Sequence, residues 1–112
     1  MKVLKEGVKD MKNILLICGS GASSGFMAAS IRKAAKKNGR EVSVKAISEA
    51  QLDEYIQTTD ILLIGPHLAY MLEDLKNKMK GKNILIDIIP QSIYGALDGG
   101  AALELITKME EA

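Results

Sequence analysis

A single cysteine, Cys18, ends an aliphatic run and begins a stretch rich in glycine and serine, ILLICGSGASSGF over residues 14–26. A thiol in this setting is a candidate nucleophile. Inward-pointing backbone N–H groups and the start of a following helix both favour the thiolate, which is the reactive form. The residues predicted to form an anion-binding loop around the sulfur are Gly19, Ser20, Gly21, Ala22, Ser23, Ser24 and Gly25.

The position of Cys18 separates this hypothesis from a purely structural one. Lone cysteines in aliphatic strands are more often small core side chains than nucleophiles. A core cysteine is expected in the middle of a strand, whereas Cys18 directly precedes a loop with three glycines and three serines in residues 19–25. The position therefore favours a functional thiol.

Other phosphate-binding motifs fit the loop poorly. A dinucleotide-binding G-x-G-x-x-G has Ser24 in place of its third glycine, and a Walker A loop would need Gly-Lys where the chain has Gly25-Phe26. A low-molecular-weight cysteine phosphatase has arginine six residues after its cysteine, where this chain again has Ser24. Without a guanidinium to stabilise the transferring group, we expect the loop to hold a phosphoryl group on sulfur and to lose it slowly to water.

Short aliphatic segments alternate with segments of helical spacing. Strands are predicted at 13–18, 42–47, 60–64 and 83–87, and helices at 24–38, 49–58, 68–80 and 100–110. This alternation predicts a small doubly wound α/β/α domain with a four-stranded parallel sheet, similar to flavodoxin-like folds. Ligands bind beyond the carboxyl ends of the strands in such sheets, and Cys18 lies at that edge.

Other side chains are predicted either to join this edge or to fill the core. Pro66 and His67 follow the third strand and Tyr94 follows the fourth, so they are candidates for the rim of the site or for partner contact. Phe26 is expected on the buried face of the first helix, and Tyr70 is expected to pack from the third.

Composition limits the other functions. Fifteen basic and fourteen acidic residues leave a formal charge of +1, which argues against binding nucleic acid or an anionic membrane. One cysteine excludes an internal disulfide, and nothing is spaced as metal ligands, so we expect a cytoplasmic protein without metal or cofactor. No segment has the length and apolar character of a membrane span. Residues 1–11 are predicted to be a flexible extension of a domain spanning 12–112.

Three motifs together resemble the IIB component of the sugar phosphotransferase system (PTS), of the lactose/cellobiose/chitobiose class. They are ILLICGSGASSGF, GPHLAYMLEDLK at 65–76 and SIYGALDGG at 92–100. The resemblance implies a cytoplasmic phosphocarrier in which Cys18 accepts a phosphoryl group from a phosphohistidine on the IIA component. Cys18 then passes the group to a β-disaccharide held by the membrane-embedded IIC transporter. Family members often carry Gln at the position of His67, so this residue departs from the pattern.

Two alternatives stay open at this point. One is a weak cysteine phosphatase of the low-molecular-weight type, which rapid turnover of an aryl phosphate would reveal. The other is a non-enzymatic module that binds phosphate or a nucleotide. A receiver domain is disfavoured, because the first strand ends in Cys-Gly-Ser-Gly where a receiver needs acidic residues.

Overall fold

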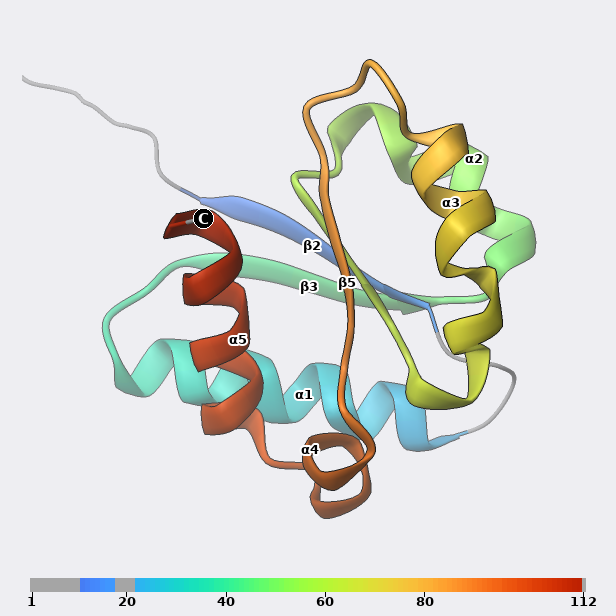
Figure 1. The fold of residues 1–112 in the computed structure, drawn as a ribbon. Helices are drawn as coiled ribbons and strands as arrows, with labels where there is room; N and C mark the ends of the chain where they lie inside the picture. Colours follow the sequence, from blue (N-terminus) through green and yellow to red (C-terminus); the bar gives the residue numbers. More distant parts are fainter. Residues whose placement is uncertain (1–10, 18–21, 112) are drawn as a thin grey trace, which may run out of the picture.

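A four-stranded parallel sheet forms the centre of the computed structural model, which describes residues 11–17 and 22–111, without the side chains of 22–24. The strand order is β3-β2-β4-β5 (Figure 1). The strands are β2 (Lys12–Ile17), β3 (Val42–Ile47), β4 (Ile61–Ile64) and β5 (Leu85–Ile88). In register, Ile17 pairs with both Ile47 and Ile64, and Ile64 pairs with Ile88. The predicted fold class and the predicted strands are confirmed, with ends that differ by one or two residues.

Helices cover both faces of the sheet. One face carries α1 (Ala22–Lys37), α4 (Gln91–Ala96) and α5 (Gly99–Glu111), and the other carries α2 (Leu52–Tyr55) and α3 (Leu72–Lys78). In Figure 1, β5 runs between α5 and α3. Side chains of β2 alternate between the two cores, with Leu16 on the α1 side and Ile17 on the α3 side. The central strands are apolar almost throughout because both faces are buried.

Local signals set most helix boundaries. Helix α1 ends in a Schellman motif, in which Gly39 has a φ of 71° and the Arg40 N–H donates to the Ala35 carbonyl at 2.9 Å. A capping box begins the next segment, in which the Ser48 N–H donates to Gln51 Oε1 at 3.2 Å. The segment that follows is three short pieces, η1 (Glu49–Gln51), α2 and η2 (Ile56–Thr58), where the sequence predicted one helix.

Helix α4 was not predicted. The sequence predicts no element between residues 87 and 100, but the chain turns into a helix directly after Pro90, its N-cap. The helix ends at Leu97, which adopts the left-handed conformation with a φ of 52°, and the Asp98 N–H donates to the Ile93 carbonyl at 3.0 Å. Non-glycine residues adopt this conformation rarely, and glycine is the residue usually expected at such a helix end. Because the chain has leucine here, the sequence gives no sign that the helix ends at this residue.

The start of α5 packs very closely on α1. A Cβ added at Gly99 would lie 2.1 Å from the Ser30 carbonyl oxygen, far inside van der Waals contact. Glycine is therefore required at this position for close backbone approach. The contact fixes where α4 and α5 sit relative to the first helix.

Strand β5 forms one free edge of the sheet. Two backbone N–H groups point inward, toward β4. The Leu85 N–H donates to the carbonyl of Asp60, the residue before β4, at 3.0 Å, and the Ile89 N–H donates to the Ile64 carbonyl at 2.8 Å. The alternate N–H of Ile88 donates instead to Oδ1 of its neighbour Asp87 at 2.8 Å. The Asp87 carboxylate thus already accepts the Ile88 N–H, which points to the exposed side of the strand.

In the part of the chain that the structure describes, no helix has both the length and the apolar character needed to cross a bilayer.

Candidate functional site

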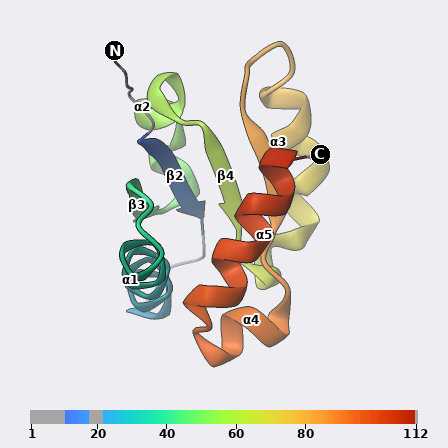
Figure 2. The same ribbon diagram turned by 90° about the vertical axis from the view of Figure 1, so that its left-hand side faces the viewer.

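The chain diverges at the carboxyl ends of β2 and β4. These strands are neighbours, yet the chain after β2 enters α1 on one face and the chain after β4 enters α3 on the other. Such a divergence is the switch point at which doubly wound sheets bind ligands. Figure 2 shows the arrowheads of β2 and β4 pointing toward this end, where α4 and the first turns of α1 lie.

Backbone hydrogen bonds align the carboxyl ends of β2, β4 and β5 at this edge of the sheet. The Gly65 N–H donates to the Ile17 carbonyl at 2.7 Å, and the Ile89 N–H donates to the Ile64 carbonyl at 2.8 Å. Ile17 is the last residue of β2, and Cys18 follows it directly in the sequence. The segments that leave β2, β4 and β5 therefore start side by side.

The predicted phosphate-binding loop lies partly outside the described residues. Cys18, Gly19, Ser20 and Gly21 are among the residues that the structure does not describe. Ala22, Ser23 and Ser24 form the start of α1. The roles predicted for these residues stay predictions.

Gly25 was predicted to belong to the loop, but the structure places it in a helix. Helix α1 begins at Ala22, two residues before the predicted start, so Gly25 already lies inside the helix. Its Cα faces open space, with nothing within 4 Å of an added Cβ. Neither a turn nor a close approach requires glycine there. A part in phosphate binding stays a prediction for Gly25.

The predicted rim residues come together. Pro66 lies in the first turn of η3 (Pro66–Met71), whose N-cap is Gly65, and fixes the backbone directly after β4. The exposed ring of His67 meets the ring of Tyr94 edge-on, with centroids 5.8 Å apart and planes at 66°. Tyr94 comes from α4 and is only 8% exposed, within the core on the α1 side. His67 thus rests on a fixed aromatic ring at the edge of the sheet.

Charged side chains are absent from the segments that leave β2, β4 and β5. No Asp, Glu, Lys or Arg occurs at residues 13–31, 61–72 or 88–97, although such residues make up 26% of the chain. A surface depleted of charge and rich in aromatic side chains is typical of the core of a protein interface. We call these three ranges the uncharged segments.

Two aromatic side chains of the uncharged segments are exposed, which corrects the sequence prediction. Phe26 is 61% exposed and Tyr70 is 77% exposed, although both were expected to pack inward. The buried stripe of α1 consists of Met27, Ala28, Ile31 and Ala35, and Phe26 lies beside this stripe. Phe26 lies near the start of α1, which follows β2, and Tyr70 lies in η3, which follows β4. Helical periodicity alone did not predict that these two rings are exposed. The lack of charged residues around them in the sequence could have indicated a surface for protein contact.

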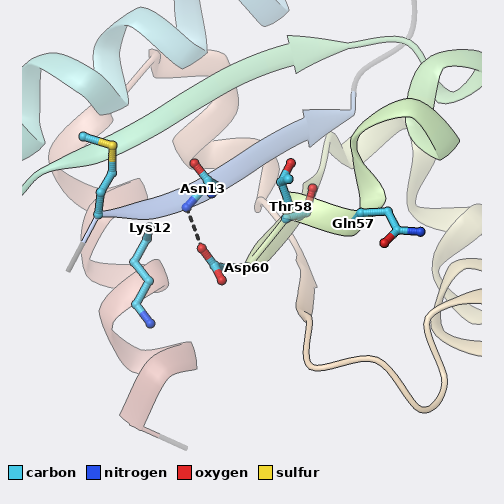
Figure 3. A pocket seen from close by; sticks show the side chains of 7 residues that line it. Lys12, Asn13, Gln57, Thr58 and Asp60 are labelled. Atoms are coloured by element: carbon cyan, nitrogen blue, oxygen red, sulfur yellow. Dashed lines mark hydrogen bonds between the residues drawn. The ribbon is translucent and has the colours of Figure 1, made fainter. Parts of the chain in front are cut away.

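The opposite, amino end of the sheet has a different character. A hollow of about 400 Å³ there is lined by polar side chains of β2 and of the chain before β4, including Lys12, Gln57 and Thr58 (Figure 3). At its centre, Asp60 Oδ2 accepts the Asn13 N–H at 2.8 Å. The Asp60 N–H donates back to the Asn13 carbonyl at 2.8 Å, and the Asp60 carbonyl accepts the Leu85 N–H at 3.0 Å. Asp60 therefore ties together three strands, which is a structural role.

Metal binding finds no support in the described part of the chain. Among residues 11–17 and 22–111, no three His, Cys, Asp or Glu side chains gather closely enough to hold an ion.

Comparisons with known proteins agree on one family. Residues 13–105 match the family model described as the PTS system, lactose/cellobiose-specific IIB subunit. The oligo-beta-mannoside-specific EIIB component of Bacillus subtilis is 31% identical over 94 residues, covering 84% of this chain and 91% of that protein. The solution structure of the cellobiose-specific IIB component of Borrelia burgdorferi is 32% identical, with a TM-score of 0.72, covering 89% and 92% of the two chains.

A longer relative joins two components in one polypeptide. The lactose-specific EIICB component of Streptococcus mutans is 29% identical over 101 residues, which cover 88% of this chain but 18% of that protein.

Proposed function

Since the chain belongs to the lactose/cellobiose-specific IIB subunits of the phosphotransferase system, we propose that Cys18 is its phosphorylated residue. Residues 19–25 are the proposed cradle for the phosphoryl group, and Pro66, His67 and Tyr94 form the proposed rim. The observation that carries this proposal is the switch point at Ile17 and Ile64. Ile17 and Ile64 end paired strands, so the chain position after Ile17 is expected beside the switch point where doubly wound sheets bind ligands, which supports the proposal.

The proposed reaction is two transfers through one sulfur. The Cys18 thiolate attacks the phosphorus of a phosphohistidine, so the P–N bond breaks, a P–S bond forms and the freed imidazole nitrogen takes a proton. A sugar hydroxyl oxygen later attacks the same phosphorus, the P–S bond breaks and the thiolate is restored. The hydroxyl proton passes to a base at the sugar site. Both steps need in-line approach by a partner, which an open edge permits.

The proposed donor is a phosphorylated IIA protein, and the proposed acceptor is a sugar bound to a IIC transporter. The EIICB relative supports the second pairing, because its name places IIB and IIC in one protein. The uncharged segments support docking by both partners in turn, since an apolar rim with exposed Phe26 and Tyr70 fits protein contact better than solvent. The proposed sugar class is a β-linked disaccharide or oligosaccharide, as the names of the relatives suggest.

Mass measurement after incubation with a phosphorylated IIA protein tests the proposal. The native chain should gain one phosphoryl group, and Cys18→Ser should gain none because the reactive thiolate is gone. Thr58→Ser, at the opposite end of the sheet, is the matched control and should be phosphorylated like the native chain. Phosphorylation of Cys18→Ser would overturn the proposal. Fast turnover of p-nitrophenyl phosphate by the native chain would point to a phosphatase instead.

A further inference from the structure

Helix α1 carries a concentration of positive charge that the net charge of the chain conceals. The whole chain has a formal charge of +1, yet residues 22–37 contain four basic residues and no acidic one. Lys33, Lys36 and Lys37 are exposed, and we call these three residues the cationic side of α1. The charge of the whole molecule therefore does not describe the field at this surface.

The two arginines of this region are used inside the molecule, whereas the lysines are not. Arg32 Nη1 donates to the Val44 carbonyl of β3 at 2.6 Å, and Arg40 forms an ion pair with Glu110 of α5 at 3.0 Å. In the part of the chain that the structure describes, no hydrogen bond or ion pair engages the three lysines. Their charges are thus available to a partner outside the molecule.

The elements that pack on α1 supply few opposing charges. Strand β3 has no acidic residue, and helix α5 has three, of which Glu110 is paired with Arg40. Among the described residues, neither Glu104 nor Glu111 of α5 forms an ion pair with a lysine of α1. The cationic side of α1 is therefore not neutralised from within the domain.

The cationic side continues a line that begins at an exposed aromatic ring. Phe26 precedes Lys33 by seven residues and Lys37 by eleven, a spacing that places all three along one line of a helix over about 16 Å. Phe26 is 61% exposed and lies at the end of this line near the start of α1. Lysines beside an aromatic ring are typical of protein surfaces that lie on an anionic membrane.

We propose that the cationic side of α1 holds the protein reversibly on an anionic lipid surface. The choice of a membrane as the partner rests on the proposed function, in which the acceptor is a sugar held by a IIC transporter of the membrane. The kind of cation supports a lipid surface. Recognition of one carboxylate or phosphate favours the planar fork of arginine, whereas lysine offers a point charge on a flexible stem. A diffuse layer of headgroup charge needs several such cations and no fixed geometry.

This contact is electrostatic, because the apolar stripe of α1 stays in the core of the domain and does not enter the bilayer. Adsorbed carrier and membrane-bound acceptor then lie in the same thin layer, which raises the concentration of each for the other. Transfer from a IIA protein in solution involves no lipid and does not depend on this surface.

Flotation of lipid vesicles tests the inference on the full, unphosphorylated chain without a purification tag. Vesicles of phosphatidylglycerol and phosphatidylcholine in equal parts are compared with vesicles of phosphatidylcholine alone. Each lysine near an anionic surface contributes about fivefold to partitioning, so at low salt the chain should prefer the anionic vesicles by about a hundredfold. Salt at about 500 mM should remove most of this preference, because it screens charges over a shorter distance.

Two sets of substitutions locate the binding surface. Changing all three lysines of the cationic side to Gln should abolish the preference, whereas changing them to Arg should keep it. The matched control removes three exposed lysines from α3 and the turn after it, with the changes Lys76→Gln, Lys80→Gln and Lys82→Gln. This control loses the same amount of charge and should bind anionic vesicles like the native chain. Thermal unfolding of each variant verifies that it is folded.

Three results would overturn the inference. The first is equal binding of the native chain to both kinds of vesicle. The second is an equal loss of binding in the two Gln variants, which would show that net charge decides. The third is no preference for anionic vesicles together with slower phosphoryl transfer from the donor to the cationic-side Gln variant, which would assign these lysines to a protein contact. Because vesicle binding needs no phosphoryl group, this inference and the proposed function can fail separately.

Discussion

The two ends of the sheet differ in their charged and aromatic side chains. At the carboxyl end, the segments that leave β2, β4 and β5 lack charged residues and expose the rings of Phe26 and Tyr70. At the amino end, Lys12 and Lys82 flank Asp60, and the backbone around Asp60 is tied by hydrogen bonds to β2 and β5. Charged residues thus lie at the amino end, where Asp60 bonds to neighbouring strands. They are absent from the uncharged segments at the carboxyl end, where a partner is proposed to dock.

The difference separates stability from function in this small domain. The Asp60 side chain at the amino end already has a partner within the chain, so changes there should alter unfolding. The exposed aromatic side chains at the carboxyl end contribute little to the core, so changes there should alter transfer between proteins. Four kinds of change test this separation, taken from the largest expected effect to the smallest.

Placing a negative charge at the carboxyl end should have the largest effect. Phe26→Glu and Tyr70→Glu should each slow phosphoryl transfer from the donor by about tenfold to a hundredfold, as expected when a buried interface anchor becomes a charge. Thermal unfolding should be nearly unchanged because both side chains are mostly exposed. Transfer rates at low donor concentration measure the effect.

Matched changes at the amino end provide the control. Gln57 and Thr58 are also exposed, so Gln57→Glu and Thr58→Glu add the same charge at the surface of the other end of the sheet. Both variants should transfer at the native rate. Equal losses from both ends of the sheet would show that net charge, and not a docking surface, controls the reaction.

Removal of the carboxylate that ties the strands comes next. Asp60→Ala should lower the free energy of unfolding by about 1–3 kcal/mol, because the Asn13 N–H loses a charged acceptor. Urea unfolding measures this loss, and Asp60→Asn, which keeps a side-chain acceptor, should lose less. Phosphoryl transfer at 25 °C should stay near the native rate while the protein is folded. A stable Asp60→Ala that no longer accepts phosphate would contradict the separation of the two ends.

The smallest effect is expected from salt. If partners dock on the uncharged segments, the rate of transfer should change by less than about twofold between about 50 and 500 mM salt, since screening acts on charge pairs. A steep decline with salt would instead assign docking to the cationic side of α1. That side includes Lys33, Lys36 and Lys37, which are exposed.

Most of the fold follows from patterns that the chain carries locally. Doubly buried strands read as aliphatic runs, and Gly39 and Ser48 mark helix ends by their own conformations and hydrogen bonds. Helix α4 escaped prediction because it has six residues and ends at a left-handed leucine instead of a glycine. Tyr94 within it is placed by the core, which local propensity does not describe.

The candidate site divides in the same way. The topology that brings Pro66 and Tyr94 to the same edge follows from strand alternation, so both were predicted as rim residues. The contact of His67 with Tyr94 depends on β4 and β5 being neighbours, which one sequence does not specify. The exposure of Phe26 was missed because it directly precedes the buried stripe of α1, and helical periodicity alone does not fix the limits of that stripe.

The free edge of β5 bears on how the protein behaves when many copies are crowded together. An unpaired strand edge is a template on which another chain can add, which is a first step toward aggregation. Asp87 places its carboxylate on the Ile88 N–H and occupies a donor that an incoming strand would need. This contact should disfavour the addition of a strand from another copy of the chain at β5.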